Sequence, residues 1–213
     1  MKALIVCGGK APEKELLLEE LKDSDIIIAA DKGAEALYKC NIKPNFIVGD
    51  FDSIDENILN YYRKNNINLN AFPVEKDFTD SEAAVIKAIN MGAHKIALLG
   101  CTGSRLDHVL SNINLLYYSL TSNIQCYIRD EFNYIRMVEK PTYIKKDKFK
   151  YFSLLSFKED VINLTIHGAK YPLNNHHLKV GYLSGLGVSN EIKENEAYIE
   201  FSSGILLIIQ SRD

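Results

Sequence analysis

Two aspartates separated by one residue follow a short apolar run in the segment FIVGDFDSI, residues 46–54. Asp50 and Asp52 come directly after Gly49, so both carboxylates are expected at the tip of a buried strand. Two unit charges about 4 Å apart repel by about 4 kcal/mol at an effective dielectric of 20. Such a pair either raises its own pKa values or holds a cation. Oxygen ligands without paired His or Cys favour magnesium as that cation.

More acidic residues and glycines follow the other apolar runs. In chain order they include Gly8, Gly9, Asp31, Asp77, Asp80, Gly100, Gly103, Arg105 and Asp107. Ligands of open α/β sheets bind beyond the carboxyl ends of the strands, so these residues are expected to converge on one edge. Glycines allow backbone N–H groups to approach phosphate oxygens. Glycines, carboxylates and a divalent cation together indicate a nucleotide site.

Each of these residues also has a purely structural interpretation. Asp80 and Asp107 can be acidic residues in the first turn of a helix, and Asp50 and Asp52 can be turn formers. The pair Gly8-Gly9 lacks a third spaced glycine, because neither GxGxxG nor GxxxxGK[ST] occurs in the chain. The conjunction of all these features at successive strand ends favours the nucleotide site.

Strand-like and helical patterns alternate in the first half of the chain. Short β-like runs cover residues 3–7, 26–30, 46–48, 95–99 and 124–128, and helical spacing covers residues 13–21, 58–64, 79–91 and 106–118. This alternation predicts an α/β fold with a Rossmann-like parallel sheet and helices on both faces. Two capping boxes, Thr79-x-x-Glu82 and Ser104-x-x-Asp107, are expected to open the last two helices.

The pattern changes after about residue 129. Strand-like runs over residues 148–157, 161–166, 177–183, 197–201 and 205–209 are separated by Gly, Pro, Asn and acidic turns. We therefore predict two domains. Residues 1–129 would form the α/β nucleotide- and metal-binding catalytic domain, and residues 130–213 a small all-β sandwich.

Composition limits the class of partner. The 213 residues are 46% apolar and carry a net charge of -3 without a basic block, which argues against nucleic acid and anionic membranes. No apolar run approaches the length of a membrane span, and the N-terminus does not resemble a secretory signal. The four cysteines form no CxxC pair. These features predict a cytoplasmic protein with small-molecule ligands.

An ordered set of motifs resembles one family over nearly the whole chain. The motifs are CGGK, ADKGAEAL, PNFIVGDFDSI, EKDFTDSEAA, LLGCTGSRLDH, HGAKYPL and SGLGVSNEI. This set is similar to that of the thiamine pyrophosphokinases. The resemblance implies transfer of a pyrophosphoryl group from magnesium-ATP to the hydroxyl of thiamine, giving thiamine diphosphate and AMP. It also implies a homodimer with thiamine bound between subunits, and a thiamine-binding role for the β-domain.

The resemblance further implies roles for individual residues. Asp50 and Asp52 are expected to bind magnesium, Asp80 to be a further ligand or to support the ligands, and Asp107 to accept the hydroxyl proton or to bind metal. Arg105 and Lys76 would stabilise phosphate charge. The nucleotide site would include Gly8, Gly9, Asp31, Lys76, Asp77, Thr79, Gly100, Thr102, Gly103 and Ser104. Thiamine would contact Tyr171, Ser189 and Asn190.

Two other functions remain open at this point. A glycosyltransferase can also hold a metal and a sugar diphosphate with an Asp-x-Asp pair, and it would bind a nucleotide sugar in preference to ATP. A non-catalytic thiamine or nucleotide sensor would bind its ligand tightly without turnover, although binding alone does not require so many carboxylates.

Overall fold

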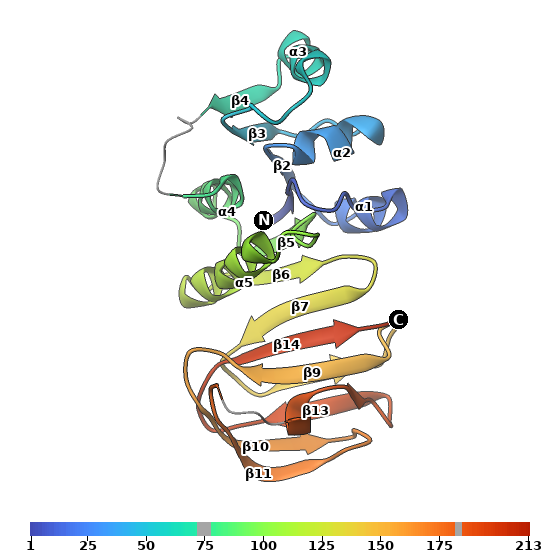
Figure 1. The fold of residues 1–213 in the computed structure, drawn as a ribbon, viewed down its shortest axis with the longest axis vertical. Helices are drawn as coiled ribbons and strands as arrows, with labels where there is room; N and C mark the ends of the chain where they lie inside the picture. Colours follow the sequence, from blue (N-terminus) through green and yellow to red (C-terminus); the bar gives the residue numbers. More distant parts are fainter. Residues whose placement is uncertain (72–77, 182–184) are drawn as a thin grey trace. The chain divides into compact units, whose positions relative to one another are not determined.

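The computed structural model describes residues 1–71, 78–181 and 185–213 (Figure 1). The chain divides into two compact units, Met1–Glu131 and Phe132–Asp213. Within the described residues, no helix has both the length and the apolar character needed to cross a membrane.

The unit Met1–Glu131 contains a parallel sheet. Its described strands are β1 (Lys2–Val6), β2 (Ile26–Ala30), β3 (Phe46–Gly49), β4 (Asn68–Ala71), β5 (Lys95–Leu99) and β6 (Gln125–Arg129). Their order is β6-β5-β1-β2-β3-β4, and each neighbouring pair is parallel. Every residue of β1 is buried, as expected for a central strand that is covered on both faces. The predicted parallel sheet is confirmed.

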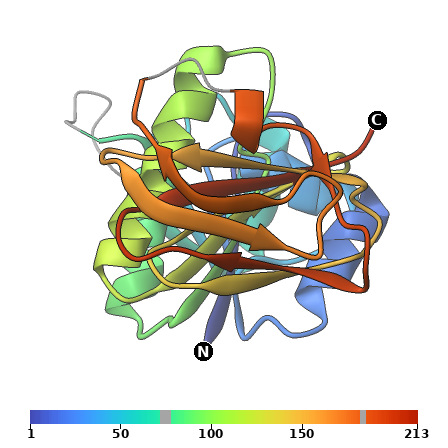
Figure 2. The ribbon, with the colours of Figure 1, turned by 90° about the horizontal axis from the view of Figure 1, so that it is seen from below.

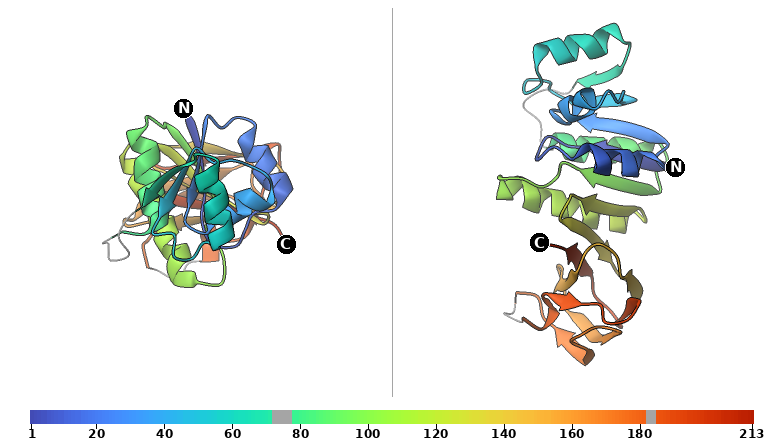
Figure 3. Two further views of the ribbon diagram at one scale, coloured as in Figure 1. Left: turned by 90° about the horizontal axis from the view of Figure 1, so that it is seen from above. Right: turned by 90° about the vertical axis from the view of Figure 1, so that its right-hand side faces the viewer.

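Helices cover both faces of this sheet, as predicted. On one side lie α1 (Lys14–Leu21), α2 (Gly33–Lys39) and α3 (Glu56–Lys64), and on the other α4 (Asp80–Asn90) and α5 (Leu106–Thr121) (Figure 1). The right panel of Figure 3 looks onto the side of α1, α2 and α3. Right-handed crossovers explain the division, because the chain moves from β1 to β4 in one direction and then returns to β5 and β6.

Two elements of this unit are absent from the sequence-based prediction. Helix α2 is only seven residues long and begins at Gly33, where a Cβ would lie 1.9 Å from the Val6 carbonyl oxygen. Strand β4, at the edge of the sheet, has the sequence NLNA, and asparagine is uncommon in strands. Short length and polar composition therefore concealed both elements.

The two predicted capping boxes have different outcomes. Thr79 is the N-cap of α4, and its Oγ1 accepts a hydrogen bond from the Glu82 N–H at 3.2 Å. The second box is wrong, because the N-cap of α5 is Arg105 and no side chain caps this helix. An N-cap at Ser104 would require the helix to begin at residue 105. The helix begins at Leu106, so Asp107 is its second residue.

The unit Phe132–Asp213 is the predicted all-β sandwich. Its strands are β7 (Asn133–Val138), β8 (Thr142–Lys145), β9 (Tyr151–Ser156), β10 (Val161–His167), β11 (Leu173–Leu178), β12 (Asn190–Glu191), β13 (Glu196–Glu200) and β14 (Leu206–Ser211). They form two antiparallel sets, in the orders β12-β9-β14-β7 and β11-β10-β13-β8. Side chains of both sets, such as Phe152, Leu164 and Ile199, share one buried core. Strands β10 and β11 are nearest the viewer in Figure 2.

The strand predicted over residues 177–183 is wrong. Strand β11 occupies Leu173–Leu178 and is followed by a turn, in which the Val180 N–H donates to Asp160 Oδ1 at 2.9 Å and Gly181 has a φ of +69°. Residues 182 and 183 of the predicted run lie outside the described residues. Strands β7 and β8 were not predicted, because β7 carries Arg136 at its centre and β8 has only four residues.

Candidate active site

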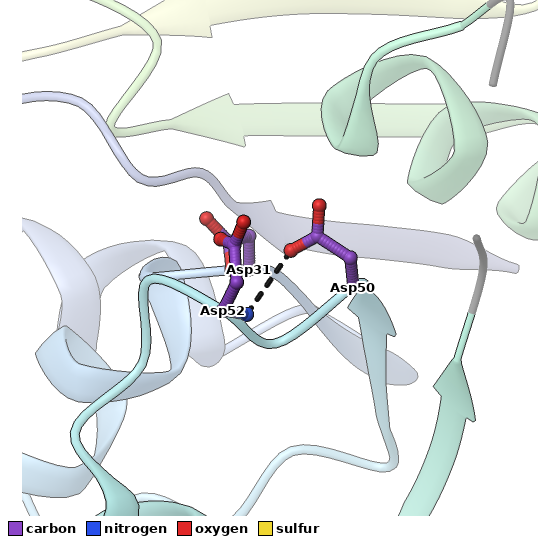
Figure 4. A group of neighbouring side chains, drawn as sticks. All are labelled: Asp31, Asp50 and Asp52. Atoms are coloured by element: carbon purple, nitrogen blue, oxygen red, sulfur yellow. Dashed lines mark hydrogen bonds between the residues drawn. The ribbon is translucent and has the colours of Figure 1, made fainter. Parts of the chain in front are cut away.

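Three carboxylates meet at the carboxyl ends of β2 and β3 (Figure 4). Asp31, Asp50 and Asp52 each offer one oxygen, and these oxygens all lie within 4.8 Å of one another. Strands β2 and β3 are parallel neighbours, so the residues that follow them emerge side by side. The Asp52 N–H donates to Asp50 Oδ1 at 3.1 Å, which fixes the turn between the two aspartates. We call these three residues the acidic cluster.

A glycine allows the cluster to form. A Cβ at Gly49 would lie 3.2 Å from Asp80 Oδ1 and 3.3 Å from Asp31 Cβ, so a side chain here would crowd both aspartates. The backbone is left-handed at Asp31, with a φ of 47°, and at Phe51, with a φ of 66°. Such conformations are uncommon for residues other than glycine and often accompany functional sites.

Burial and neighbouring carboxylates raise pKa values within the acidic cluster. Burial raises the pKa of Asp31, a hydrogen bond from Ser53 Oγ opposes this shift, and the charges of Asp80 and Asp50 add to it. The pKa of exposed Asp52 is also raised, first by its hydrogen bond with Asp50 and then by the charge of that residue.

A hard divalent cation fits this donor set. Within the described part of the chain, the buried Asp31 Oδ1 has no hydrogen-bond partner. An unsatisfied buried oxygen beside two further carboxylates has the chemistry of a site for such a cation.

Asp80 lies at the edge of this cluster. It is the first residue of α4, and its charge contributes to the raised pKa values of Asp31 and Asp52. The sequence predicted a metal set of Asp50, Asp52 and Asp80. The structure brings Asp31 into the close set of three oxygens and places Asp80 Oδ1 near Gly49 beside it, and the metal set itself stays a prediction.

Two glycine-containing loops meet at the carboxyl ends of β1 and β5. The Gly9 N–H donates to the Gly100 carbonyl at 2.9 Å, and the Lys10 N–H donates to the Thr102 carbonyl at 2.7 Å. A Cβ at Gly9 would lie 2.5 Å from both acceptor oxygens, so only glycine allows this contact. Helices α1 and α5, which follow these loops, cover opposite faces of the sheet. The loops therefore lie at the topological switch point, where open α/β sheets bind ligands.

The remaining residues of these loops differ in exposure. Gly8 and Gly103 are exposed, Thr102 is half-buried, and Ser104 is exposed just before α5. A Cβ at Gly103 would lie 3.3 Å from the Lys10 nitrogen, so this glycine also contributes to the close approach of the loops.

Arg105 and Asp107 form an exposed ion pair at the start of α5. Arg105 Nη2 lies 2.6 Å from Asp107 Oδ2, and Arg105 Nε donates to Asp107 Oδ1 at 3.3 Å. The guanidinium of Arg105 holds the pKa of Asp107 below its usual range. Asp107 is therefore ionised at neutral pH, as a metal ligand or proton acceptor has to be.

Comparisons with known proteins agree with this geometry. Residues 17–128 match the family description "Thiamin pyrophosphokinase, catalytic domain", and residues 142–206 match "Thiamin pyrophosphokinase, vitamin B1 binding domain". The thiamine pyrophosphokinase of Bacillus subtilis is 38% identical over 211 residues, covering 98% of this chain and 98% of the relative. This chain belongs to the thiamine pyrophosphokinase family.

Solved structures of the family support the same conclusion. The crystal structure of the Bacillus subtilis thiamine pyrophosphokinase aligns with a TM-score of 0.90 at 35% identity, covering 100% of both chains. The structure of the Geobacillus thermodenitrificans protein aligns with a TM-score of 0.87 at 32% identity, covering 100% of this chain and 98% of the other. The resemblance that the motifs predicted is confirmed, and neither a glycosyltransferase nor a sensor is favoured.

The three residues predicted for thiamine in this thiamine pyrophosphokinase fold lie in the unit Phe132–Asp213. The Tyr171 side chain is exposed, whereas Asn190 is buried and bonded to the backbone of Tyr171. Ser189 is exposed with a φ of 55°, and its N–H donates to Ser153 Oγ at 3.1 Å. Of the residues predicted for the nucleotide, Lys76 and Asp77 lie outside the described residues.

Two residues outside the predicted site set support the thiamine pyrophosphokinase site. Ser53 binds Asp31, and the only sequence signal was its position directly after the Asp-x-Asp pair. Asn112 is buried in α5 and donates to the Cys101 carbonyl at 3.0 Å, which ties the helix to the glycine loop after β5. Helix α5 has two asparagines, Asn112 and exposed Asn114, and no sequence signal distinguishes the buried one.

Proposed function

We propose that the chain transfers the pyrophosphoryl group of magnesium-ATP to the hydroxyl of thiamine, giving thiamine diphosphate and AMP. The observation that carries this proposal is the acidic cluster of Asp31, Asp50 and Asp52 at the ligand-binding edge of a thiamine pyrophosphokinase fold. The thiamine hydroxyl oxygen attacks the β-phosphorus, the bond to the α-phosphate oxygen breaks, and AMP leaves. No covalent enzyme intermediate is required for this step.

The protein contributes positioning and charge complementarity to this reaction. Asp50 and Asp52 would hold magnesium together with Asp31, and Asp80 would be a further ligand or support the others. When bound, magnesium neutralises charge on the phosphates. Arg105 would donate hydrogen bonds to phosphate oxygens, and Asp107 would accept the thiamine hydroxyl proton or bind metal.

The remaining contacts are proposed from the motifs and from the position of the loops. ATP would contact residues from four loops, namely Gly8, Gly9, Asp31, Lys76, Asp77, Thr79, Gly100, Thr102, Gly103 and Ser104. Residues 1–129 would supply this catalytic and nucleotide site. Residues 130–213 would bind thiamine at a site that includes Tyr171, Ser189 and Asn190.

We also propose that the active form is a homodimer with thiamine near the subunit interface. Exposed apolar side chains lie beside proposed site residues in each unit. Leu106 and Leu110 are 72% and 64% exposed next to Arg105, and Leu186 and Val188 are 55% and 47% exposed near Ser189 in sequence. A second copy of the chain would cover such residues. Sedimentation velocity would test this, since a monomer at working concentration would contradict it.

A cytoplasmic location fits the cysteines. All four are free thiols, and free thiols are typical of proteins in a reducing compartment.

Phosphorus NMR of the purified protein with ATP, magnesium and thiamine tests the reaction. We expect AMP and thiamine diphosphate to form together, and both to be lost when EDTA replaces magnesium or when thiamine is omitted. Release of ADP as the stoichiometric product would contradict pyrophosphoryl transfer. Tight binding of thiamine without any product would instead support a sensor.

A further inference from the structure

The side-chain amide of Asn190 forms hydrogen bonds with both the N–H and the carbonyl of Tyr171. The Tyr171 N–H donates to Asn190 Oδ1 at 3.0 Å, and Asn190 Nδ2 donates to the Tyr171 carbonyl at 2.8 Å. Asn190 is 2% exposed, whereas Tyr171 is 57% exposed. A buried amide therefore fixes the main chain of a residue whose ring faces solvent.

The local strand pairing explains why a side chain, and not a backbone group, forms hydrogen bonds with the Tyr171 backbone. The backbone around Ala169 runs beside that around Ile192, with the Lys170 N–H donating to the Glu191 carbonyl at 2.8 Å. At Asn190 the backbone pairs instead with Phe152 of β9. The Asn190 amide, which has the same donor and acceptor as a peptide group, extends the pairing to Tyr171.

The hydrogen-bonding capacity of Asn190 is nearly exhausted. Its Oδ1 accepts from the Tyr171 N–H and also from the Glu191 N–H at 2.9 Å, which occupies both lone pairs of that oxygen. Its Nδ2 donates to the Tyr171 carbonyl. Asn190 is therefore poorly suited to bind a ligand directly, although its neighbour Tyr171 is well exposed.

The ring of Tyr171 already lies close to a cation. Lys170 Nζ is 5.4 Å from the centroid of this ring and 2.8 Å from Glu191 Oε1. Pro172 restricts the backbone of Tyr171 to extended conformations, which adds to the restraint from Asn190. The main chain that carries the ring is thus restrained, and the exposed face of the ring can stack on a planar cation.

We infer that Asn190 is a positioning residue, which acts on the substrate only through the backbone of Tyr171. The ring of Tyr171 contacts the cationic heterocycle of the substrate, and Asn190 keeps that ring in place. This inference rests on the proposed function and deepens its thiamine site. It also gives Asn190 a role different from direct contact with thiamine.

A double-mutant cycle on the full chain separates the two roles. We expect Asn190→Ala to raise the KM for thiamine about 10-fold and to leave the KM for ATP within about twofold. In the Tyr171→Ala background, Asn190→Ala should change the KM for thiamine by less than about twofold, because the ring it positions is gone. The same fold-change in both backgrounds would show that Asn190 acts independently of the Tyr171 ring and would overturn the inference.

Fluorescence gives a readout that does not depend on turnover. The chain has no tryptophan, so Tyr171→Trp introduces a single fluorophore at this position. We expect Asn190→Ala in this variant to lower the tryptophan anisotropy without ligand and to weaken the fluorescence change on titration with thiamine. Unchanged anisotropy and unchanged titration would also overturn the inference.

Controls keep the outcomes distinct. Asn174→Ala changes an exposed asparagine of β11 and should alter neither KM nor anisotropy. If thermal unfolding shows that Asn190→Ala does not fold, Asn190→Asp takes the place of Asn190→Ala in the cycle. Asn190→Asp keeps the oxygen that accepts the Tyr171 N–H and loses the N–H group that donates to the Tyr171 carbonyl. If the unmodified protein forms no thiamine-dependent AMP, the proposed function fails, and the anisotropy of the single tryptophan still decides whether Asn190 fixes residue 171.

Discussion

At the residue scale, mutual repulsion in the acidic cluster opposes the stability of the folded protein. The pKa values of Asp31 and Asp52 are raised, so ionising them in the folded protein is less favourable than in the unfolded chain. Gly49 nevertheless lets Asp31 and Asp80 approach closely. Residues held in this way against mutual repulsion are typical of functional sites.

Asp50→Asn is expected to abolish turnover and to leave the fold intact. The change removes one negative charge from the proposed metal site, while the Asp52 N–H can still donate to the remaining amide oxygen. We expect a loss of about 100-fold or more in kcat, because even partners that only support metal ligands contribute about 10- to 100-fold. Initial rates of AMP formation would measure the loss.

A matched control is Asp23→Asn, which neutralises an exposed carboxylate paired with Lys2 in the loop before β2. It should leave turnover unchanged. Full activity of Asp50→Asn would remove Asp50 from the metal site, and an equal loss in both variants would point to a general effect of charge.

The sequence predicted individual site residues better than their partners. The Asp-x-Asp pair after an apolar run was sufficient to predict that Asp50 and Asp52 lie together. The contribution of Asp31 depends on the close approach at Gly49 and on the hydrogen bond from Ser53, neither of which leaves a periodic signal. The contact between Asn190 and Tyr171 joins residues 19 positions apart and depends equally on tertiary structure.

At the scale of elements, the start of α4 combines a cap with a site residue. Thr79 accepts the Glu82 N–H, and Asp80 follows it as the first helical residue. The favourable interaction of Asp80 and Glu82 with the helix dipole adds to this cap. Thr79 therefore stabilises the helix that carries a proposed metal-site residue.

Thr79→Ala should lower the free energy of unfolding by about 1 kcal/mol, the usual cost of losing an N-cap side chain. Thr79→Ser keeps the hydroxyl and should restore most of this loss. Ser104→Ala provides a contrast, because no side chain caps α5, and it should change stability by less than about 0.5 kcal/mol. Urea unfolding of the three variants would measure these differences, and equal losses at Thr79 and Ser104 would contradict the assignment of the cap.

Elements were predictable where their hydrophobic period was long or regular. Strands β2 and β5 have the bounds that their apolar runs predicted. Strand β11 did not, because its sequence LNNHHL has apolar residues only at its ends and its Asn175 has a φ of 53°. Strand β11 lies at the edge of its sheet and is mostly polar, whereas strands are usually rich in β-branched and aromatic residues.

At the scale of the whole molecule, the two units are stabilised in different ways. The unit Phe132–Asp213 has an apolar core between its sheets. The unit Met1–Glu131 also contains a buried ionic network, in which Glu20 of α1 binds Lys2 of β1 and Tyr127 and Arg129 of β6. Fold class was predictable because it depends on the apolar pattern, whereas this network joins residues that are distant in sequence.

The ionic network makes stability depend on pH in a defined direction. Although burial opposes ionisation, hydrogen bonds from Lys2, Tyr127 and Arg129 lower the pKa of Glu20 below its ordinary value of 4.5. Glu20 therefore contributes stability that is present above pH 4.5 and is lost as the pH falls through its lower folded pKa. The pKa of Lys2 is raised above 10.5 despite burial, so the Lys2 contribution is lost only as the pH rises through that higher value.

Glu20→Gln should therefore destabilise the unit Met1–Glu131 by about 3 kcal/mol at neutral pH, because it leaves buried Lys2 and Arg129 without their shared partner. The difference from the unmodified protein should be constant between about pH 5 and about pH 10 and should shrink in more acidic solution. Urea unfolding followed by the helical signal in circular dichroism would measure it, since the five α-helices of the described residues all belong to this unit.

Glu19→Gln is the matched control for this prediction. Glu19 Oε2 lies 2.8 Å from Arg129 Nη2, but its side chain is 51% exposed, whereas that of Glu20 is 5% exposed. Water and salt screen an exposed pair, so this variant should lose less than about 1 kcal/mol at any pH. Equal losses in the two variants, or a Glu20→Gln loss that grows in acid, would show that burial of the Glu20 carboxylate is not what gives the network its strength.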